Sequence, residues 1–215
     1  MRYLIFGDVH GNLLALEQLL RIEKGNYDLL ICHGDVVGYG PWADECVSLL
    51  SQDDRNIILR GNHEEAFINK VYSGTNLIAK SFFDFCLPRF SSFLSISNYQ
   101  DNFDLGNFIV KHTIMDLYVF KDTDLSNILI DRNFIIGHSH YQFSRYVNNF
   151  NIINTGSLGQ NRKYINLAEY LIYDQKINKV YLKSFVFDVD HLLNELISNG
   201  YPDICIKYYQ SKNRI

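Results

Sequence analysis

Carboxylate, carboxamide and imidazole side chains recur in this sequence where short apolar runs end. They are Asp8, His10, Asp35, Asn62, His63, His112, His138 and His140. The first pair, Asp8 and His10, lies two residues apart and directly before a glycine, an arrangement that suits a divalent cation held on a turn. One Asp-x-His pair occurs by chance in many chains. Four further apolar runs also end in Asp, Asn or His, and this recurrence indicates a metal site.

Apolar runs and amphipathic segments alternate through the first 64 residues. The pattern predicts short strands over residues 2–6, 29–32 and 56–59, a helix that begins at residue 13 after Asn12, and a helix over residues 43–50. This β-α-β-α-β order is typical of an α/β sheet, whose ligand sites lie beyond the carboxyl ends of the strands. The polar residues of this half all fall at such ends, so the fold itself should gather them.

The rest of the chain predicts more strands than helices. We expect a helix within residues 75–87 that ends at Pro88, a hairpin around Gly106 and a strand that ends at His112. Residues 91–100 show no period, and residues 116–127 predict a loop with a short helix. The remaining expected elements are a strand over 134–137, a hairpin that turns at Asn148-Asn149, strands over 168–173 and 180–187, and a helix over 189–198.

Composition narrows the class of protein. With 215 residues, 47% of them hydrophobic and 20% charged, the chain is expected to form one globular domain over residues 1–215. A net charge of −4 argues against non-specific nucleic-acid binding, although bound cations would still permit a phosphate substrate. No apolar run reaches membrane-span length. Four scattered cysteines without a CxxC spacing predict reduced thiols and a cytoplasmic location.

Three segments of the first half resemble the first three motifs of the calcineurin-like metallophosphoesterases. They are Asp8-Val9-His10-Gly11-Asn12, Gly34-Asp35-Val36-Val37-Gly38-Tyr39-Gly40-Pro41 and Gly61-Asn62-His63-Glu64. The second run is similar to the small bacterial and archaeal phosphodiesterase-like branch that lacks a cap. The third reads like the phosphoprotein phosphatases, which usually carry Asp-Arg-Gly where this chain has Gly38-Tyr39-Gly40.

The resemblance continues through the second half of the chain. His112-Thr113 matches the fourth motif with threonine in place of glycine, and Gly137-His138-Ser139-His140 matches the fifth. The run from Asn154 to Arg162 resembles the Asn-Pro-Gly-Ser segment of relatives, with Thr155 for proline. The fold that the resemblance implies is a four-layer α/β/β/α sandwich of two mixed sheets.

The resemblance also implies a dinuclear metal site. One metal would be bound by Asp8, His10 and His140, the second by Asn62, His112 and His138, and Asp35 would bridge the two. Ligands of this kind without thiolate suit manganese first, with iron, zinc or nickel as alternatives. A water held between the cations would be the nucleophile, and His63 would protonate the leaving oxygen.

Several of these residues also have simpler interpretations. Asn62 could cap the helix that follows it, and His112 could be a core histidine. Arg162 could orient a substrate phosphate or be a solvated loop residue, and Tyr39 is more simply a loop residue than part of a cleft. His33 suits packing beside the site better than ligation, and His191 suits the surface.

The expected function is hydrolysis of a phosphodiester or phosphomonoester, with a small phosphoester or nucleotide-type substrate as partner. A phosphoprotein or dinucleoside-polyphosphate phosphatase is the alternative within the class. A non-catalytic interaction module on the same fold is the alternative from another class, but no ligand position of the motifs is lost. The oligomeric state stays open, and specificity should lie in the loops 38–42, 115–124 and 157–162.

Overall fold

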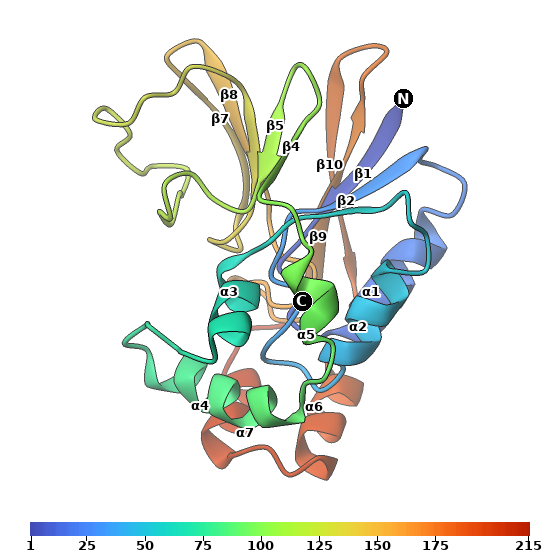
Figure 1. The fold of residues 1–215 in the computed structure, drawn as a ribbon, viewed down its shortest axis with the longest axis vertical. Coiled ribbons are helices and arrows are strands. Elements are labelled where there is room, and N and C mark those ends of the chain that lie inside the picture. The colour runs from blue at the N-terminus through green and yellow to red at the C-terminus, as the bar shows by residue number, and fades with distance from the viewer.

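Two mixed five-stranded sheets form the centre of the protein in a computed structural model that describes all of residues 1–215 (Figure 1). The first sheet has the order β10-β9-β1-β2-β3. Its strands are β1 (Arg2–Phe6), β2 (Leu29–Cys32), β3 (Ile57–Ile58), β9 (Leu167–Asp174) and β10 (Lys179–Val186). β1, β2 and β3 run parallel, whereas β9 and β10 are antiparallel to their neighbours. The carboxyl ends of the three parallel strands therefore meet at one edge.

The second sheet has the order β4-β5-β6-β8-β7. Its strands are β4 (Asn102–Asp104), β5 (Ile109–Lys111), β6 (Phe134–Ile136), β7 (Gln142–Val147) and β8 (Phe150–Thr155). β5, β6 and β8 are parallel to one another, so the turns after β5 and β6 also share an edge. β7 and β8 form a hairpin through Asn148 and Asn149, both in the left-handed region that such two-residue turns require.

Seven α-helices lie against the first sheet and beyond its lower end (Figure 1). They are α1 (Leu13–Ile22), α2 (Ala43–Leu50), α3 (Asn62–Asn69), α4 (Leu77–Cys86), α5 (Phe93–Ser97), α6 (Val189–Ser198) and α7 (Asp203–Gln210). Asn12 caps α1, because its side-chain oxygen accepts a hydrogen bond from the Ala15 N–H at 3.1 Å. α4 passes into a 3₁₀ turn at Pro88, where the missing N–H ends the α-helix. None of these helices has the length and apolar character needed to cross a bilayer.

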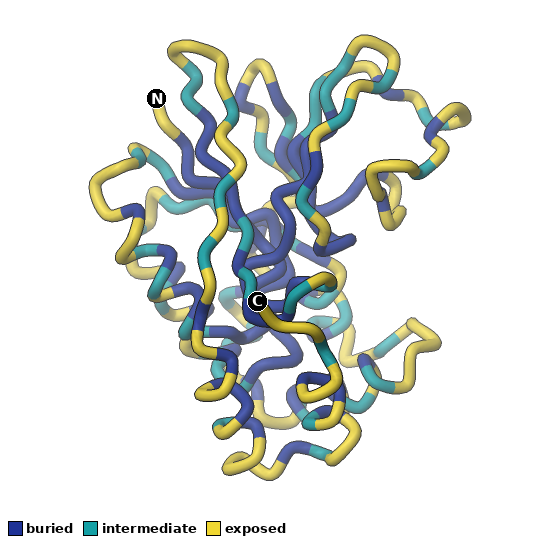
Figure 2. The backbone as a smooth tube through the Cα atoms, turned by 180° about the vertical axis from the view of Figure 1, so that it is seen from behind, coloured by how far each residue is buried: buried dark blue, intermediate teal, exposed yellow.

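Side chains alternate between the two faces of each strand, and this divides the core into layers. In β1, Leu4 and Phe6 face the helices, whereas Tyr3 and Ile5 face the second sheet. The helix-facing cluster is the largest, with 37 buried residues, and 11 more fill the space between the two sheets. Figure 2 shows these buried segments along the strands, with exposed residues at the loop tips and the outer helix faces.

The outer face of the second sheet is covered by an irregular segment, residues 113–131, that lies beside β7 and β8 (Figure 1). Its buried residues Ile114, Val119, Leu125 and Ile130 pack on the sheet in a third cluster. The short helix expected within residues 116–127 does not form. Side-chain to backbone hydrogen bonds shape the segment instead, as at Ser139 Oγ, which donates to the Val119 carbonyl at 2.8 Å.

The expected α/β sandwich of two mixed sheets is confirmed, and its fourth layer is the irregular segment 113–131 in place of the expected helices. Several expected elements match the observed bounds, including the helix over 43–50 and the strand over 29–32. Two helices, α5 and α7, were not expected. The buried residues of α7 are Cys205, Tyr208 and Tyr209, which have the helical spacing of three and four residues. The other positions of α7 include four exposed residues, so the sequence shows only a short apolar pattern there.

A buried carboxylate joins α1 to the strands of the first sheet. Glu23 is 1% exposed and accepts hydrogen bonds from the Tyr170 hydroxyl at 2.6 Å and from the Lys183 ammonium. Burial alone would raise the pKa of Glu23, but the bonds from Lys183 and Tyr170 lower it below the ordinary value of 4.5. Folding therefore favours the ionised carboxylate.

Replacing Glu23 with Gln should lower the free energy of unfolding at neutral pH by about 2 kcal/mol, the scale of a buried charged hydrogen bond. Because the folded pKa is depressed, this contribution is present above pH 4.5 and is lost as the pH falls through the folded value. Urea unfolding of wild type, Glu23→Gln and the exposed control Glu17→Gln checks this. An equal gap between wild type and Glu23→Gln at neutral and strongly acidic pH would contradict it.

Candidate metal centre

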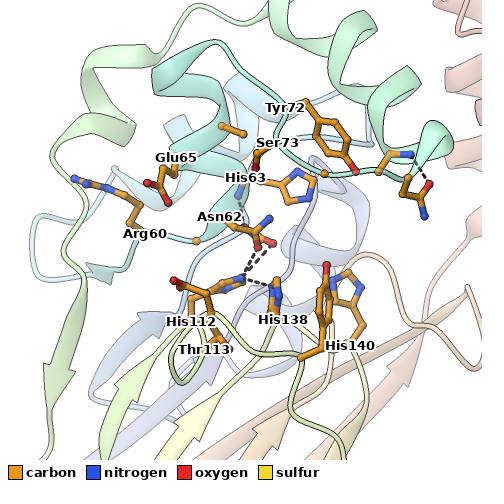
Figure 3. Close-up of a pocket in the computed structure, with 18 of the residues that line it drawn as sticks. Arg60, Asn62, His63, Glu65, Tyr72, Ser73, His112, Thr113, His138 and His140 are labelled. Atoms are coloured by element: carbon orange, nitrogen blue, oxygen red, sulfur yellow. Dashed lines mark hydrogen bonds and ion pairs between the residues drawn. The ribbon is translucent and has the colours of Figure 1, made fainter.

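The turns at the carboxyl ends of the parallel strands bring the expected ligands into one place. Asp8 and His10 follow β1, and Asp35 follows β2. The other expected residues come from the start of α3 (Asn62, His63), from the end of β5 (His112) and from the turn after β6 (His138, His140). In Figure 3 the labelled histidines and Asn62 lie around one hollow, although they come from segments up to 78 positions apart.

The first group of donor atoms is formed by Asp8, His10, Asp35 and His140, and all of these residues are buried. Their donor atoms lie within 4.8 Å of one another. His140 Nε2 is 3.2 Å from both Asp8 Oδ1 and His10 Nε2, and His10 Nε2 is 3.8 Å from Asp35 Oδ2. This is the set expected for the first metal, with the bridging aspartate at its edge.

The second group is formed by Asp35, His112 and His138. His112 Nε2 lies 3.3 Å from Asp35 Oδ2, 3.1 Å from His138 Nδ1 and 3.0 Å from Asn62 Oδ1. Asp35 thus belongs to both groups. Asn62 is the one member exposed at the mouth of the hollow. It is also the first residue of α3, whose N-cap is Gly61, so the alternative interpretation of Asn62 as an N-cap is wrong.

The chemistry of the donor atoms fits a cation. His140 Nδ1 lies 2.6 Å from the Gln160 carbonyl and His10 Nδ1 3.3 Å from the Val37 carbonyl, and a carbonyl can only accept. When neutral, both rings therefore carry their proton on Nδ1 and present the Nε2 lone pair, and these two Nε2 atoms face each other. Asp8 Oδ1 is buried and accepts no hydrogen bond. Lone pairs that converge without a hydrogen-bond donor between them are typical of a metal site.

The local electrostatics also favour a cation at this site. Burial opposes ionisation of Asp8 and Asp35, but the neighbouring imidazoles, His140 for Asp8 and His112 for Asp35, hold the pKa of each carboxyl below its usual range. Burial would lower the pKa of His112, yet Asp35 raises it to about 9. The site therefore stabilises positive charge between its carboxylates, which is also what a metal cation would supply.

Five of these residues have left-handed backbone conformations. Their φ angles are 49° at Asp8, 51° at His10, 54° at Asp35, 68° at His138 and 60° at His140. Such φ values are uncommon for residues other than glycine and cost roughly 1–2 kcal/mol each. Strain of this kind persists only where the surroundings fix the backbone, and it is concentrated at functional sites.

Glu64 fixes the turn that carries Asp35. Its buried carboxylate accepts hydrogen bonds from the backbone N–H groups of Asp35, Val36, Val37 and Gly61, at 2.7–3.1 Å. Burial and the Asp35 carboxylate raise the pKa of Glu64 to about 7, and the N–H donors oppose that rise. The sequence motif contains Glu64, but only the structure reveals this positioning role.

His63 stands beside the first group without belonging to it. Its ring centroid is 4.7 Å from that of His10 and 5.4 Å from that of Tyr39, and its backbone N–H donates to Asp35 Oδ1 at 2.8 Å. The His63 ring lines the hollow, and burial lowers its pKa. A Cβ at Gly38 would lie 2.7 Å from His63 Nδ1, so only glycine leaves room for the ring there.

The hollow opens into a cavity of about 790 Å³. Arg162, Tyr39 and Tyr118 line it, and the Tyr118 ring stacks on His138 at 4.0 Å. Tyr39 is therefore part of the cleft rather than a plain loop residue, and Arg162 is not a solvated arginine. Residues 71–74 and Asn76 also line the cavity, although no motif marks them.

The two remaining histidines lie outside the donor groups. His33 is buried, its Nε2 lies 2.6 Å from Thr155 Oγ1, and its carbonyl lies 3.2 Å from His112 Nδ1. Burial lowers the pKa of His33 to about 4, so the ring is neutral. His191 is exposed on α6, as expected for a surface residue.

Removing the Glu64 carboxylate should loosen the Asp35 turn. We expect Glu64→Gln to lower the free energy of unfolding by about 2 kcal/mol, because an amide cannot accept four hydrogen bonds from backbone donors. Glu65→Gln, at the exposed neighbouring position, should change it by less than about 0.5 kcal/mol. Denaturant unfolding of both variants is the measurement, and equal effects at the two positions would rule out this role of Glu64.

Comparison with known proteins agrees with this geometry. The chain is 27% identical to an uncharacterized protein of Methanocaldococcus jannaschii, over 93% of each chain. Its fold matches a metallophosphoesterase from Sphaerobacter thermophilus with a TM-score of 0.80 at 23% identity, over 98% of each chain. A hypothetical protein from Pyrococcus horikoshii matches with the same TM-score at 13% identity, over 97% of each chain. The family model for calcineurin-like phosphoesterases matches residues 1–212, and the chain belongs to that family.

Proposed function

We propose that this protein hydrolyses a phosphodiester or a phosphomonoester with the help of two divalent cations. The observation that carries the proposal is the pair of ligand groups that share Asp35, together with the buried lone pairs of the first group, which converge without a hydrogen-bond donor between them. Asp8, His10, Asp35 and His140 would hold one cation, and Asp35, Asn62, His112 and His138 the other. Ligands of this type favour manganese, with iron, zinc or nickel as alternatives.

Two such cations, when bound, acidify a water and act as Lewis acids on phosphoryl oxygens. The chain's own residues would do the rest. The convergent turns would fix where the phosphate lies, and the cavity beside them would hold the ester. His63 sits beside the first group and makes no ring hydrogen bond that would compete with the substrate. It would donate a proton to the leaving oxygen.

Arg162 would orient the substrate. Arg162 lines the cavity together with His63 and His140, and the planar fork of N–H donors of a guanidinium suits phosphoryl oxygens. A cavity of this size is typical of small-molecule sites, which favours a small phosphoester or nucleotide-type substrate over a phosphoprotein. A dinucleoside polyphosphate remains the second candidate. All positions of the motifs are filled, which favours an enzyme over an interaction module.

The four cysteines are free and buried, and we propose a cytoplasmic location, where thiols stay reduced.

Metal removal gives the first test of the activity. Dialysis against a chelator should abolish hydrolysis of bis(p-nitrophenyl) phosphate, and Mn²⁺ should restore it, because the nucleophile depends on the cations. Release of p-nitrophenol is the readout, with far-ultraviolet circular dichroism to show that the fold persists. Full activity of protein that atomic absorption shows to be free of metal would contradict the proposal.

Replacing His63 with Ala tests the general acid. The rate should fall about 10²–10⁴-fold for an ester with an alcohol leaving group, because that oxygen needs a proton as the bond breaks. The loss should be much smaller for a p-nitrophenyl ester, whose leaving group is stable as an anion. Steady-state kcat for the two esters, in wild type and His63→Ala, is the measurement. An equal loss for both esters would exclude a proton-donating role.

A further inference from the structure

Two cationic side chains meet at one tyrosine beside the cavity. Arg162 Nη1 donates a hydrogen bond to the Tyr208 hydroxyl at 2.8 Å. Lys212 Nζ lies over the face of the same ring, 4.5 Å from its centroid. Tyr208 belongs to α7, and Lys212 follows the end of that helix. Neither was singled out by any sequence motif.

No carboxylate neutralises this pair. Seven ion pairs join a lysine or an arginine to a carboxylate, and neither Arg162 nor Lys212 takes part in any of them. Lys212 is half-buried, and burial together with the Arg162 charge lowers its pKa. Two like charges held close together without a counter-ion oppose folding. Such an arrangement is typical of a place where an anionic ligand supplies the missing charge.

The cationic pair lies on the His63 side of the metal centre. The Tyr39 ring connects the two places: its centroid is 4.9 Å from that of His10, 5.4 Å from that of His63 and 6.3 Å from that of Tyr208. Arg162 lines the same cavity as His63, and Tyr208 and Lys212 lie next to Arg162, outside the lining of the cavity. An anion at the pair would therefore lie next to the group that is assigned to the leaving oxygen, not beyond the second donor group.

We propose that Arg162 and Lys212 form a second anion subsite, which binds a further phosphate carried by the leaving part of the substrate. The substrate class is then a phosphoester with two phosphate groups, such as a nucleotide that bears a second phosphate. Tyr208 is a positioning residue, because its hydroxyl holds the Arg162 guanidinium and its ring supports Lys212. The inference rests on the proposed function only for where the scissile phosphate lies.

Binding of inorganic pyrophosphate to the metal-free protein tests the subsite apart from catalysis. Isothermal titration calorimetry at low salt should show about tenfold weaker binding in Lys212→Met, the scale of one lost charged hydrogen bond. Lys207→Met removes the same charge from an exposed position of α7 and is the matched control. Equal affinities of Lys212→Met and Lys207→Met, or no binding of pyrophosphate to wild type, would overturn the proposal.

A substrate pair tests the same point in the Mn²⁺-loaded enzyme. Adenosine 3′,5′-bisphosphate and adenosine 3′-phosphate share the same 3′ ester bond, and only the first carries a second phosphate on its leaving part. The ratio of their kcat/KM values should favour the bisphosphate and should fall about tenfold in Lys212→Met and in Tyr208→Phe. Tyr209→Phe, which removes a buried hydroxyl that has no hydrogen-bond partner, should leave the ratio unchanged.

The possible failures are distinct. If wild type hydrolyses no phosphoester but pyrophosphate binding depends on Lys212, the proposed function fails and the anion site stands. If wild type hydrolyses both adenosine substrates with equal kcat/KM and Lys212→Met leaves the ratio unchanged, the subsite is wrong and the phosphoesterase activity stands.

Discussion

The Asp35 carboxylate is the constraint on which the rest of the site depends. It is 1% exposed, yet it lies at the point where both donor groups meet, with Oδ2 3.3 Å from His112 and 3.8 Å from His10. A buried carboxylate is tolerated only where positive charge or hydrogen-bond donors surround it. The two sheets provide these surroundings by ending their parallel strands at a common edge. The topology that places Asp8 and Asp35 together also brings His112 and His138 to them from the second sheet.

The same edge carries five of the twelve positive φ angles found at residues other than glycine. Five ligand candidates have positive φ angles, which the surrounding turns must enforce against their intrinsic cost. The Glu64 carboxylate fixes the Asp35 turn by accepting hydrogen bonds from the backbone N–H groups of Asp35 and Val36. Asp8 Oδ2 fixes the turn after β6 by accepting a hydrogen bond from the His138 N–H at 3.0 Å. Asp8 and Asp35 thus each accept a hydrogen bond from a backbone N–H and also offer a lone pair to a cation. Geometry that is fixed before a ligand arrives is what a catalytic metal centre requires.

Strands that end in polar residues were predictable from the sequence pattern, and the family resemblance implied how those residues form two ligand groups. The strand bounds for β2, the α2 helix and the hairpin at Asn148 followed from local pattern alone. The contribution of α7 could not be predicted, because Tyr208 reaches Arg162 through a hydrogen bond that spans 46 residues, and Lys212 lies over the Tyr208 ring. Glu64 lay within a motif, but which N–H groups it accepts from depends on the approach of two turns. The coverage of the second sheet by residues 113–131 likewise depends on tertiary packing, since no period marks that segment.

The central claim is that one carboxylate organises two cation sites. Metal content of the Mn²⁺-reconstituted protein, measured by inductively coupled plasma mass spectrometry after removal of free metal, tests it most directly in wild type, His112→Ala and Asp35→Ala. Two ions per chain in wild type, one in His112→Ala and fewer than one in Asp35→Ala are the expected values, because only Asp35 belongs to both groups. A single ion per chain in wild type, or the same content in Asp35→Ala as in wild type, would contradict a shared dinuclear centre.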